Sequence, residues 1–194
     1  MAIDVTKVLV GAPDQTTTGA ILDAPVGTAL PTSAVDELNE AFVSSGYISE
    51  DGLALTPDRS TTDINDWSGN AIRTLLDSFT ATITWSELEM SYDSLRHAFG
   101  SDNVKKVAAD ASHGAQVTVN INASMPDSRA WVFKMKDGNT RILIVVPNGQ
   151  VTAVDELDFT SSDAVALPIT LTCHPDSAGN SIYIYTDDGV KVTA

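Results

Sequence analysis

The residue types that could carry out catalysis are few in this chain, and none stands at the spacing of a known catalytic motif. The three histidines are His97, His113 and His174, and the single cysteine is Cys173. Cys173 and His174 are neighbours, but adjacent residues of a strand point to opposite faces of the sheet. A cysteine acts as a nucleophile with a histidine only where the two side chains meet. We therefore interpret all three histidines as surface or packing residues.

Signatures of metal, nucleotide and hydrolase sites are also missing from the sequence. The acidic segments DELDF (155–159) and TDDG (186–189) lack the EF-hand spacing. P-loop, G-x-G-x-x-G and G-x-S-x-G patterns are absent. A glycoside hydrolase stays an alternative, because two carboxylates from distant strands could meet in the fold. However, aromatic residues make up only 6% of the chain, so few are available to stack on a sugar. The sequence thus predicts a protein that is not an enzyme and has no catalytic, cofactor-binding or metal-binding residues.

The charge balance is strongly acidic, with 11 basic and 26 acidic residues and a net charge of −15. Nucleic-acid-binding proteins usually carry a basic patch, and the densest basic segment here is VKK at 104–106. The acidity serves either solubility alone or a surface that must not bind polyanions. No apolar run approaches the roughly 18 residues of a membrane span, and the first residues lack the pattern of a signal peptide. We expect no membrane insertion.

The first 70 residues predict an arm, a helix and a long loop within a single domain, residues 1–194. Residues 1–31 are rich in Thr, Gly, Ala and Pro and predict an extended N-terminal arm. Residues 34–44 predict a short helix with Ser33 as its N-cap and with Leu38 and Phe42 on one apolar face. Residues 47–70 contain a turn, a short strand and a polar run without periodicity, which predicts a long loop or arm.

The chain beyond residue 70 predicts mostly strands. In FTATITW (79–85) apolar residues alternate with threonines. The change of phase that follows predicts either a bulge near Ser86 or an edge strand that passes from the core to an interface. SYDSLRHAFG (91–100) predicts a second short helix, capped by Ser91 and ended by Gly100. The segment 115–123 alternates as a strand with its Val and Ile residues facing inward, and 142–146 reads as a central strand. Asp-Gly at 137–138 and Asn-Gly at 148–149 predict hairpin turns, a strand follows at 165–173, and DDG (187–189) predicts a last hairpin.

Three segments are distinctive when taken together: GAPDQTTTGAILDAPVGTALPT, LNEAFVSSGYISEDGLALTPDRSTTDINDWSGNAIRTL and TITWSELEMSYDSLRHAFG. They resemble the major tail tube protein (major tail subunit) of long-tailed double-stranded DNA bacteriophages of the siphophage type. The likeness is greatest to phages that infect actinobacteria. It is clear over residues 8–100 and extends more loosely to the C-terminus.

The resemblance implies a mainly β (α+β) fold: a sandwich or barrel-like tail tube domain, one or two short helices packed outside, and a long loop between subunits. It also implies a structural virion protein whose hexameric rings stack into a non-contractile tail tube, through which DNA is ejected into the host. The implied partners are further copies of the chain, the tape measure protein, and terminator and baseplate proteins, with no cofactor. The protein would then occupy the phage tail in the virion and the host cytoplasm during assembly.

Within this hypothesis, the loop 47–70 and the strand 79–90 contact neighbouring subunits. That strand and one of the C-terminal strands offer free edges for pairing. The predicted contact residues are Asp58, Arg59, Ile64, Trp67, Leu88 and Met90. Polar strand faces are predicted to line the channel through Thr80, Thr82, Thr84, Glu87, Glu89, Thr118, Asn120 and Asn122. A neutral or acidic wall would not hold DNA, whereas a basic wall would bind its phosphates.

Other interpretations stay open at the level of sequence. The chain is alternatively a monomeric, acidic β-sandwich binding module that recognises its ligand through the loop 50–70, or the tube protein of a contractile injection or secretion system. The loop is alternatively an ordinary solvent-exposed loop, and the polar faces an outer, solvated sheet.

Overall fold

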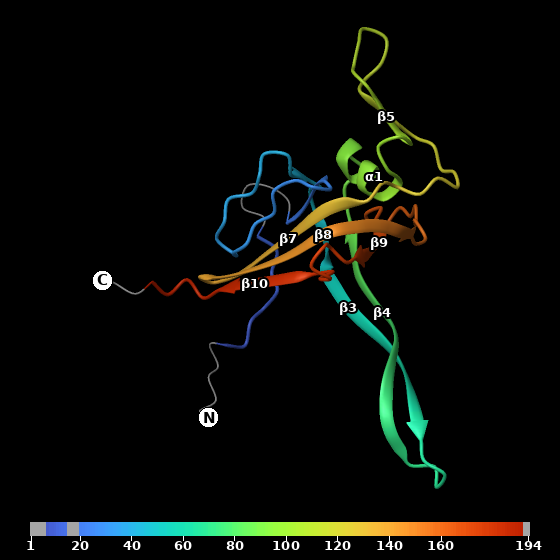
Figure 1. Ribbon diagram of the computed structural model, residues 1–194. Coiled ribbons are helices and arrows are strands. Elements are labelled where there is room, and N and C mark those ends of the chain that lie inside the picture. Colours follow the sequence, from blue (N-terminus) through green and yellow to red (C-terminus); the bar gives the residue numbers. More distant parts are fainter. Residues whose placement is uncertain (1–6, 15–19, 192–194) are drawn as a thin grey trace.

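One antiparallel sheet of eight strands forms most of the computed structural model, which describes residues 7–14 and 20–191 (Figure 1). Its strands are β1 (Ile21–Pro25), β2 (Val43–Ser44), β3 (Ile48–Asn65), β4 (Ala71–Glu87), β7 (Arg129–Asp137), β8 (Thr140–Val154), β9 (Leu167–His174) and β10 (Tyr183–Asp187). They run in the order β2-β1-β7-β8-β9-β4-β3, and β10 pairs with β8. A separate two-stranded sheet joins β5 (Val104–Val107) to β6 (Gln116–Val119), and α1 spans Tyr92–Phe99. The prediction of a mainly β fold is confirmed.

The large sheet divides at β8, because β9 and β10 both pair with the same edge of β8, at different positions along that strand. β10 pairs with residues 141–145 of β8, and β9 pairs with residues 148–154, while β7 follows the opposite edge. The two parts of the sheet face each other across the main apolar core. Trp85 of β4 lies 5.4 Å from Trp131 and 5.4 Å from Phe133, both of β7, measured between ring centroids. This packing of one sheet part on the other gives the barrel-like arrangement.

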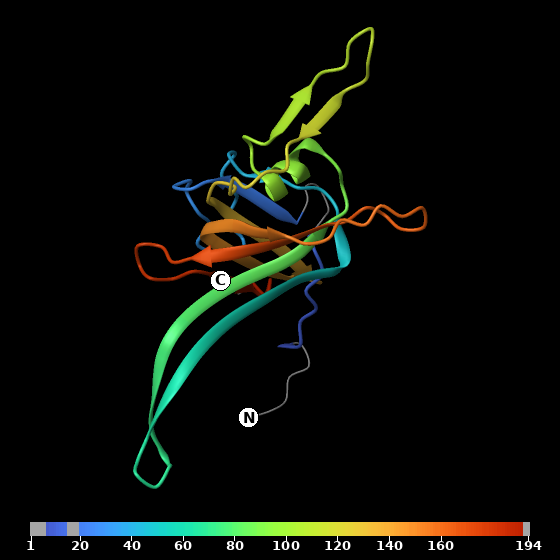
Figure 2. The same cartoon turned by 90° about the vertical axis from the view of Figure 1, so that its right-hand side faces the viewer.

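Helix α1 forms where the sequence predicts it. Ser91 is the N-cap and accepts a hydrogen bond from the backbone N–H of Ser94, and Gly100 ends the helix with φ +83°. Leu95 and Ala98 are buried beneath the helix. The helix therefore closes one end of the core (Figure 2).

The prediction of a helix at 34–44 is wrong. This segment consists of turns followed by the short strand β2. The Asp36 carboxylate accepts hydrogen bonds from the backbone N–H groups of Thr32 and Ser33, at 2.8 and 3.0 Å. Such side-chain bonds offer the backbone an alternative to the helix. The apolar residues of the segment are still packed. Leu38 and Phe42 lie in a second apolar cluster, separate from the main core, that is formed with residues of β1, β7 and β8.

Parts of the two segments that were predicted as an arm and a loop are strands of the sheet. Residues 21–25 of the predicted arm 1–31 form β1, which is paired with β2 and β7. Residues 1–6 and 15–19 of that arm lie outside the described part of the chain. The predicted loop 47–70 consists of β3 and the tip turn of a β-hairpin, in which β3 pairs with β4. Its polar run shows no periodicity because both faces of the hairpin are exposed.

The Asn148-Gly149 pair is not a turn but lies inside β8. A Cβ at Gly149 would approach Trp131 Cδ1 to 2.9 Å and the Leu171 methyl groups to 3.0 Å. The glycine is required by packing against these side chains, not by a turn. The Asp137-Gly138 turn and the central position of 142–146 are confirmed.

Three further strand predictions are corrected. A register irregularity does lie opposite Ser86, between the pairs Ile48–Glu87 and Leu53–Trp85, but its extra residues are in β3, and the alternation of β4 continues to the buried Glu87. β6 is shorter than 115–123, and Val117 and Ile121 are exposed. β10 pairs with β8 and not with the residues that follow DDG as far as residue 191.

Candidate functional site

The β3–β4 hairpin projects far from the rest of the molecule (Figure 2). Every residue from 56 to 80 is exposed. At a rise of about 3.3 Å per residue, the hairpin extends roughly 30 Å beyond the buried Ala81. Its exposed large apolar side chains are Ile64, Trp67, Ile72, Leu75, Leu76 and Phe79. A monomeric protein rarely presents so many apolar side chains on one projection, and such a surface marks an interaction site.

The hairpin is nevertheless well specified by its own polar residues. Thr62 Oγ1 donates to Asp77 Oδ2 and Thr74 Oγ1 donates to Asp63 Oδ1, each at 2.6 Å. At the tip, Asp66 Oδ1 accepts the backbone N–H groups of residues 68 and 70, each at 2.8 Å. The projection is therefore a structured hairpin that can present side chains at fixed positions.

The tip turn DWSGN (66–70) is repeated as DSAGN (176–180) after β9. In both turns the aspartate Oδ1 accepts the N–H groups two and four residues later, and the glycine has a φ near +85° (85° and 83°). The second turn has Ser177 where the first has Trp67. The turn itself does not require a tryptophan, and yet Trp67 is fully exposed at the tip. Trp67 is thus a candidate anchor for a partner, since large aromatic residues often dominate interface energies.

The six predicted contact residues fall in two places. Asp58, Arg59, Ile64 and Trp67 all lie on the exposed hairpin, where the Arg59 guanidinium lies 4.9 Å from the Phe79 ring centroid. Leu88 and Met90 lie at the opposite end of β4, just before α1. The structure does not bring these two residues near the hairpin tip. The predicted free edge is wrong for residues 81–87, because they pair with both β3 and β9.

A face rich in threonine covers β4 and its neighbours on the side away from the core. Thr82 and Thr84 of β4 lie opposite Thr172 and Thr170 of β9, and Thr82 also lies opposite Thr56 of β3. Thr152 and Thr172 share a hydrogen bond of 2.8 Å between their hydroxyl oxygens. We call this surface, which consists of Thr56, Thr80, Thr82, Thr84, Thr152, Thr170 and Thr172, the threonine face. It contains neither lysine nor arginine.

The predicted channel residues do not form one surface. Thr80, Thr82 and Thr84 share the threonine face, whereas Thr118 lies on β6 and Asn120 and Asn122 follow it. Asn122 Nδ2 donates to Asn103 Oδ1 at 2.7 Å, at the base of the β5–β6 hairpin.

The two predicted channel carboxylates differ from the threonines. Glu89 Oε1 accepts the backbone N–H of Tyr47 at 3.0 Å and is only partly exposed. The prediction is wrong for Glu87, whose exposure is 0%. A residue that is fully buried inside its own chain cannot line a channel.

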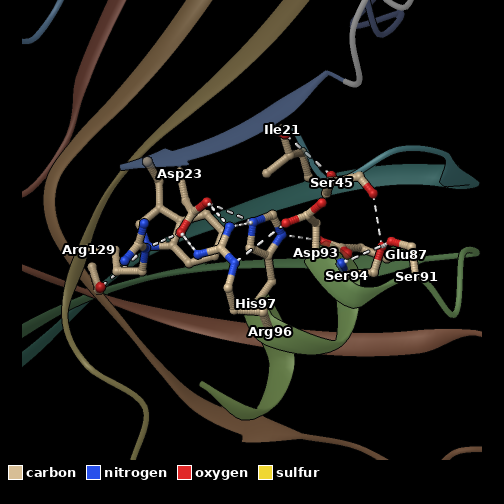
Figure 3. Close-up of polar contacts among 12 residues, drawn as sticks. Ile21, Asp23, Ser45, Glu87, Ser91, Asp93, Ser94, Arg96, His97 and Arg129 are labelled. Atoms are coloured by element: carbon tan, nitrogen blue, oxygen red, sulfur yellow. Dashed lines mark hydrogen bonds and ion pairs between the residues drawn. The ribbon is translucent and has the colours of Figure 1, made fainter. Parts of the chain in front are cut away.

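Glu87 belongs to a buried ion cluster that was not predicted from the sequence (Figure 3). At its centre is Asp23 of β1, which receives two parallel hydrogen bonds from Arg96 at 2.7 and 3.0 Å and a further one from Arg129 Nε. His97 bridges the two carboxylates, because its Nε2 lies 2.8 Å from Asp23 Oδ1 and its Nδ1 lies 3.1 Å from Glu87 Oε1. Four segments of the chain, β1, β4, α1 and β7, are joined in this way.

The geometry indicates that His97 is doubly protonated. Each ring nitrogen faces a carboxylate oxygen, and only an imidazolium can donate to both. Burial by itself lowers the pKa of His97, but the hydrogen bonds to Asp23 and Glu87 outweigh it and raise the pKa to about 9. Arg96 Nη2 also lies 3.2 Å from His97 Nε2. Both groups are donors in this state, so that contact is an approach of like charges and not a hydrogen bond.

The carboxylate of Asp23 is held in its ionised form. Burial alone would raise its pKa, but hydrogen bonds from His97 and Arg96 outweigh burial and lower the pKa far below the ordinary 3.8. Truncation of one partner in such a buried pair costs about 3–5 kcal/mol, because the other charge stays buried without compensation. The cluster is therefore an internal connection between the helix and the sheet.

The cluster does not have the properties of a catalytic site. Asp23, Glu87, Arg96 and His97 are all buried, and no substrate could reach them without unfolding. Within residues 7–14 and 20–191, no group of three or more His, Cys, Asp or Glu side chains is arranged to hold a metal ion. The helix of the described chain is also too short to cross a membrane.

Two signals in the sequence could have revealed the cluster. Asp23 interrupts the apolar strand ILDAP, and Glu87 stands in phase with the inward-facing Ile83 and Trp85. A charged residue at an inward position needs a buried partner of opposite charge. The RH pair at 96–97 supplies that partner.

The fold and these surfaces define a mainly β protein with an exposed apolar projection and a largely buried ion cluster. The family model described as phage tail tube protein matches residues 1–194. The chain belongs to this family. The family assigns it to the tube of a phage tail, a structural component of the virion. No curated protein matches the sequence.

Among solved structures, the chain is similar to the tube-terminating cap of the anti-feeding prophage. That likeness has a TM-score of 0.45 at 16% identity and covers 96% of this chain and 100% of the other. A chain of the sheath–tube complex of an extracellular contractile injection system (PVC), in its extended state, gives a TM-score of 0.45 at 11% identity, covering 94% and 98% of the two chains. The sheath/tube terminator of PVC gives 0.44 at 14%, covering 91% and 99%. These likenesses are too distant to add to the argument.

Proposed function

We propose that the protein forms homo-hexameric rings that stack into the non-contractile tail tube of a siphophage, through which DNA passes at ejection. The observation that carries the proposal is the β3–β4 hairpin, which is exposed from residue 56 to residue 80 and carries six large apolar side chains. Membership of the tail tube family supports a neighbouring subunit as the partner of this surface. The resemblance of residues 8–100 to actinobacterial siphophage tail proteins supports the non-contractile type and that group of hosts.

The contact residues proposed on the hairpin are Asp58, Arg59, Ile64 and Trp67. Leu88 and Met90 are proposed for a second contact, at the opposite end of β4. Burial of an exposed apolar side chain contributes about 1.5–3 kcal/mol. A ring repeats each contact in every subunit, so modest contacts add up to a stable tube.

The threonine face is the proposed wall of the channel. A wall of lysine and arginine would bind DNA phosphates and release counterions at each contact. Hydroxyl groups offer no such attraction, and the chain's net charge of −15 adds a weak repulsion. Salt screens this repulsion over about 8 Å under physiological conditions. DNA would therefore pass without being held. Glu89, Thr118, Asn120 and Asn122 are proposed at the rims of the channel, since they lie away from this face.

The remaining proposed partners are the tape measure protein inside the tube, and terminator and baseplate proteins at its ends. The terminator and baseplate proteins would bind the same surfaces that stack one ring on the next, because an end ring leaves one of its two surfaces uncovered. Assembly would take place in the host cytoplasm.

Electron microscopy of the concentrated protein tests the proposal. The expected result is rings with six-fold symmetry and hollow tubes. A truncated variant would lack residues 60–78, with Arg59 and Phe79 joined by an Asn-Gly turn. These two residues already lie opposite each other in the register, so a two-residue turn fits. The variant should keep the near-UV circular dichroism of the buried tryptophans and form no tubes. A wild-type protein that stays monomeric at all concentrations would refute the proposal.

The channel wall is tested by a Thr82→Lys/Thr170→Lys variant. Tubes of this variant should retain DNA at low salt and release it at high salt, whereas wild-type tubes should not retain it. Lys136→Glu is the control for a charge change elsewhere, because that side chain lies on the β7–β8 hairpin and is exposed. Equal DNA retention by variant and wild-type tubes would contradict the assignment of this face to the channel and leave the tube itself intact.

A further inference from the structure

A second hairpin leaves the molecule at the end opposite to the β3–β4 hairpin. It is formed by β5 and β6, and both views show it pointing away from the body beyond α1 (Figures 1 and 2). Val104 pairs with Val119 and Val107 pairs with Gln116. We call residues 104–119 the β5–β6 arm. The chain therefore has one projection at each end, and neither covers the other.

The two projections carry opposite charge. The β5–β6 arm has Lys105 and Lys106 against Asp110, a net charge of +1 with His113 neutral. These lysines are the single pair of adjacent basic residues in a chain of net charge −15. The β3–β4 hairpin between residues 58 and 80 has four aspartates against two arginines, a net charge of −2. Residues 129–141 are also basic, with Arg129, Lys134, Lys136 and Arg141 against Asp137, so the β5–β6 arm is distinguished by its charge and its projection together and not by charge alone.

The β5–β6 arm presents one open face. Val104 is buried, and Lys106 Nζ lies 5.9 Å from the ring centroid of Tyr92 in α1, so the face that holds these two residues turns toward the helix. The opposite face holds Lys105, Val107, Gln116 and Thr118, all of which are exposed. Val107 has 46% of its surface exposed. The open face thus combines a cation with apolar area.

The tip of the β3–β4 hairpin has the complementary combination. Asp66 and Trp67 lie in the tip turn, and Asp63 and Ile64 precede them on opposite faces of β3. Trp67 and Ile64 are exposed. The tip lies roughly 30 Å from the body of its own chain, given about 3.3 Å per residue, at the end away from the β5–β6 arm. It cannot reach the arm of the same molecule.

We propose that the hairpin tip of one copy docks on the open face of the β5–β6 arm of a second copy, next along the tube axis. This inference rests on the proposed function and names the surfaces that stack the rings. Asp63 and Asp66 then face Lys105, and Trp67 packs on Val107. The contact joins two different surfaces at opposite ends of the chain. A contact of this head-to-tail kind repeats without closing, and so gives an open-ended filament.

Charge reversal tests the contact. Lys105→Glu and Asp63→Lys should each leave rings intact and raise the protein concentration at which tubes form. Reversal of one exposed contact changes affinity about fivefold, or about 1 kcal/mol, and repetition around the ring multiplies the effect. We expect an increase of at least about tenfold for each single variant. The Lys105→Glu/Asp63→Lys double variant should recover tube formation, because it restores the attraction with its sign reversed.

The outcomes separate this contact from the function on which it rests. Lys136→Glu makes the same charge change as Lys105→Glu on the β7–β8 hairpin and should leave tube formation unchanged. If the wild type forms tubes and the single variants form them at the same protein concentration, the proposed contact is wrong but the tube is not. The same holds if the double variant forms tubes no more readily than the single variants. Wild-type protein that forms neither rings nor tubes would overturn both. Sedimentation and electron microscopy distinguish rings from tubes.

A cross-link provides a measurement that does not depend on charge. Protein with Ser68→Cys at the hairpin tip is mixed with protein carrying Thr118→Cys on the open face of the arm, and the assembled mixture is oxidised. Dimers linked between the two variants should form within tubes, and a Ser177→Cys variant should not replace Ser68→Cys as the partner. Native Cys173 is buried and does not compete. If the Ser177→Cys variant forms cross-linked dimers with Thr118→Cys as readily as the Ser68→Cys variant does, the assigned surfaces are wrong.

Discussion

Replacement of His97 by glutamine should remove a defined part of the pH dependence of stability. The pKa of His97 is raised from 6.5 to about 9 in the folded protein. A group whose pKa is raised by folding contributes stability that is complete below the unfolded pKa and is lost as the pH rises through the folded pKa. The window is therefore pH 6.5 to 9. The shift corresponds to about 3 kcal/mol at about 1.4 kcal/mol per pKa unit.

Urea unfolding of the dilute protein, followed by tryptophan fluorescence at pH 6, 7, 8 and 9, measures this effect. Trp85 and Trp131 are buried beside the cluster and report on it directly. The His97→Gln variant should be less stable at pH 6 by roughly 3–5 kcal/mol, since Asp23 and Glu87 lose a buried cation. The difference from the wild type should shrink by about 3 kcal/mol as the pH rises to 9.

The control is His113→Gln, because His113 is partly exposed and its nearest carboxylate, Asp110, is exposed. It should change the pH profile little. Other groups that titrate in the window, such as the terminal amine, are common to the wild type and the variant and cancel in the difference. A difference between wild type and His97→Gln that stays constant from pH 6 to 9 would refute the doubly protonated bridge.

Three other predictions concern packing, the helix cap and the cysteine. Gly149→Ala should lower the free energy of unfolding by about 1–3 kcal/mol, because the Cβ of the alanine would be only 2.9 Å from Trp131 Cδ1. The control is Gly114→Ala, whose added Cβ meets open space. Equal effects of the two substitutions in urea unfolding would contradict the reasoning. Ser91→Ala should cost about 1 kcal/mol by removing the N-cap bond, whereas Ser101→Ala should cost nothing measurable. Cys173 should react with a thiol reagent at pH 8 only as fast as the protein unfolds, because burial raises its pKa to about 12; rapid labelling of the folded protein would disprove this.

The parts of the fold that could be predicted from the sequence are those fixed by local chemistry. Helix α1 has its N-cap, its apolar spacing and its terminal glycine within ten residues, and all three were read correctly. The strand FTATITW was equally clear, because one of its faces is buried and the other is not. In both cases the signal and the structure lie in the same short segment.

The failures have non-local causes. The 34–44 segment has a helical pattern, but Asp36 bonds backward to Thr32 and Ser33, and the apolar residues pack on a sheet that is made elsewhere in the chain. Gly149 follows an asparagine as in a turn, but its role is set by Trp131 across the sheet. The polar run of the hairpin hides its strands, since neither face has a core to select apolar residues.

The candidate site was predicted in part for the same reasons. Asp58, Arg59, Ile64 and Trp67 are predicted to contact a neighbouring subunit, and they lie together on the projecting hairpin. Their contact with another copy stays a prediction. Glu87 was assigned to the wrong surface, because an acidic side chain is normally exposed and its partners at positions 23 and 97 are remote or on another element. Pairings between distant charges are not visible in a single sequence.

The buried ion cluster also bears on how the chain becomes folded during synthesis. Asp23 is made early, but its partners Arg96 and His97 emerge more than seventy residues later, and Arg129 emerges more than one hundred residues later. Contacts at such separations form late, and a chain dominated by them folds slowly. A ribosome-bound fragment that ends before residue 96 therefore contains an unpaired acid in an apolar strand, which opposes its premature collapse. The chain commits to its fold, and to the display of its two projecting hairpins, only when nearly the whole sheet is available.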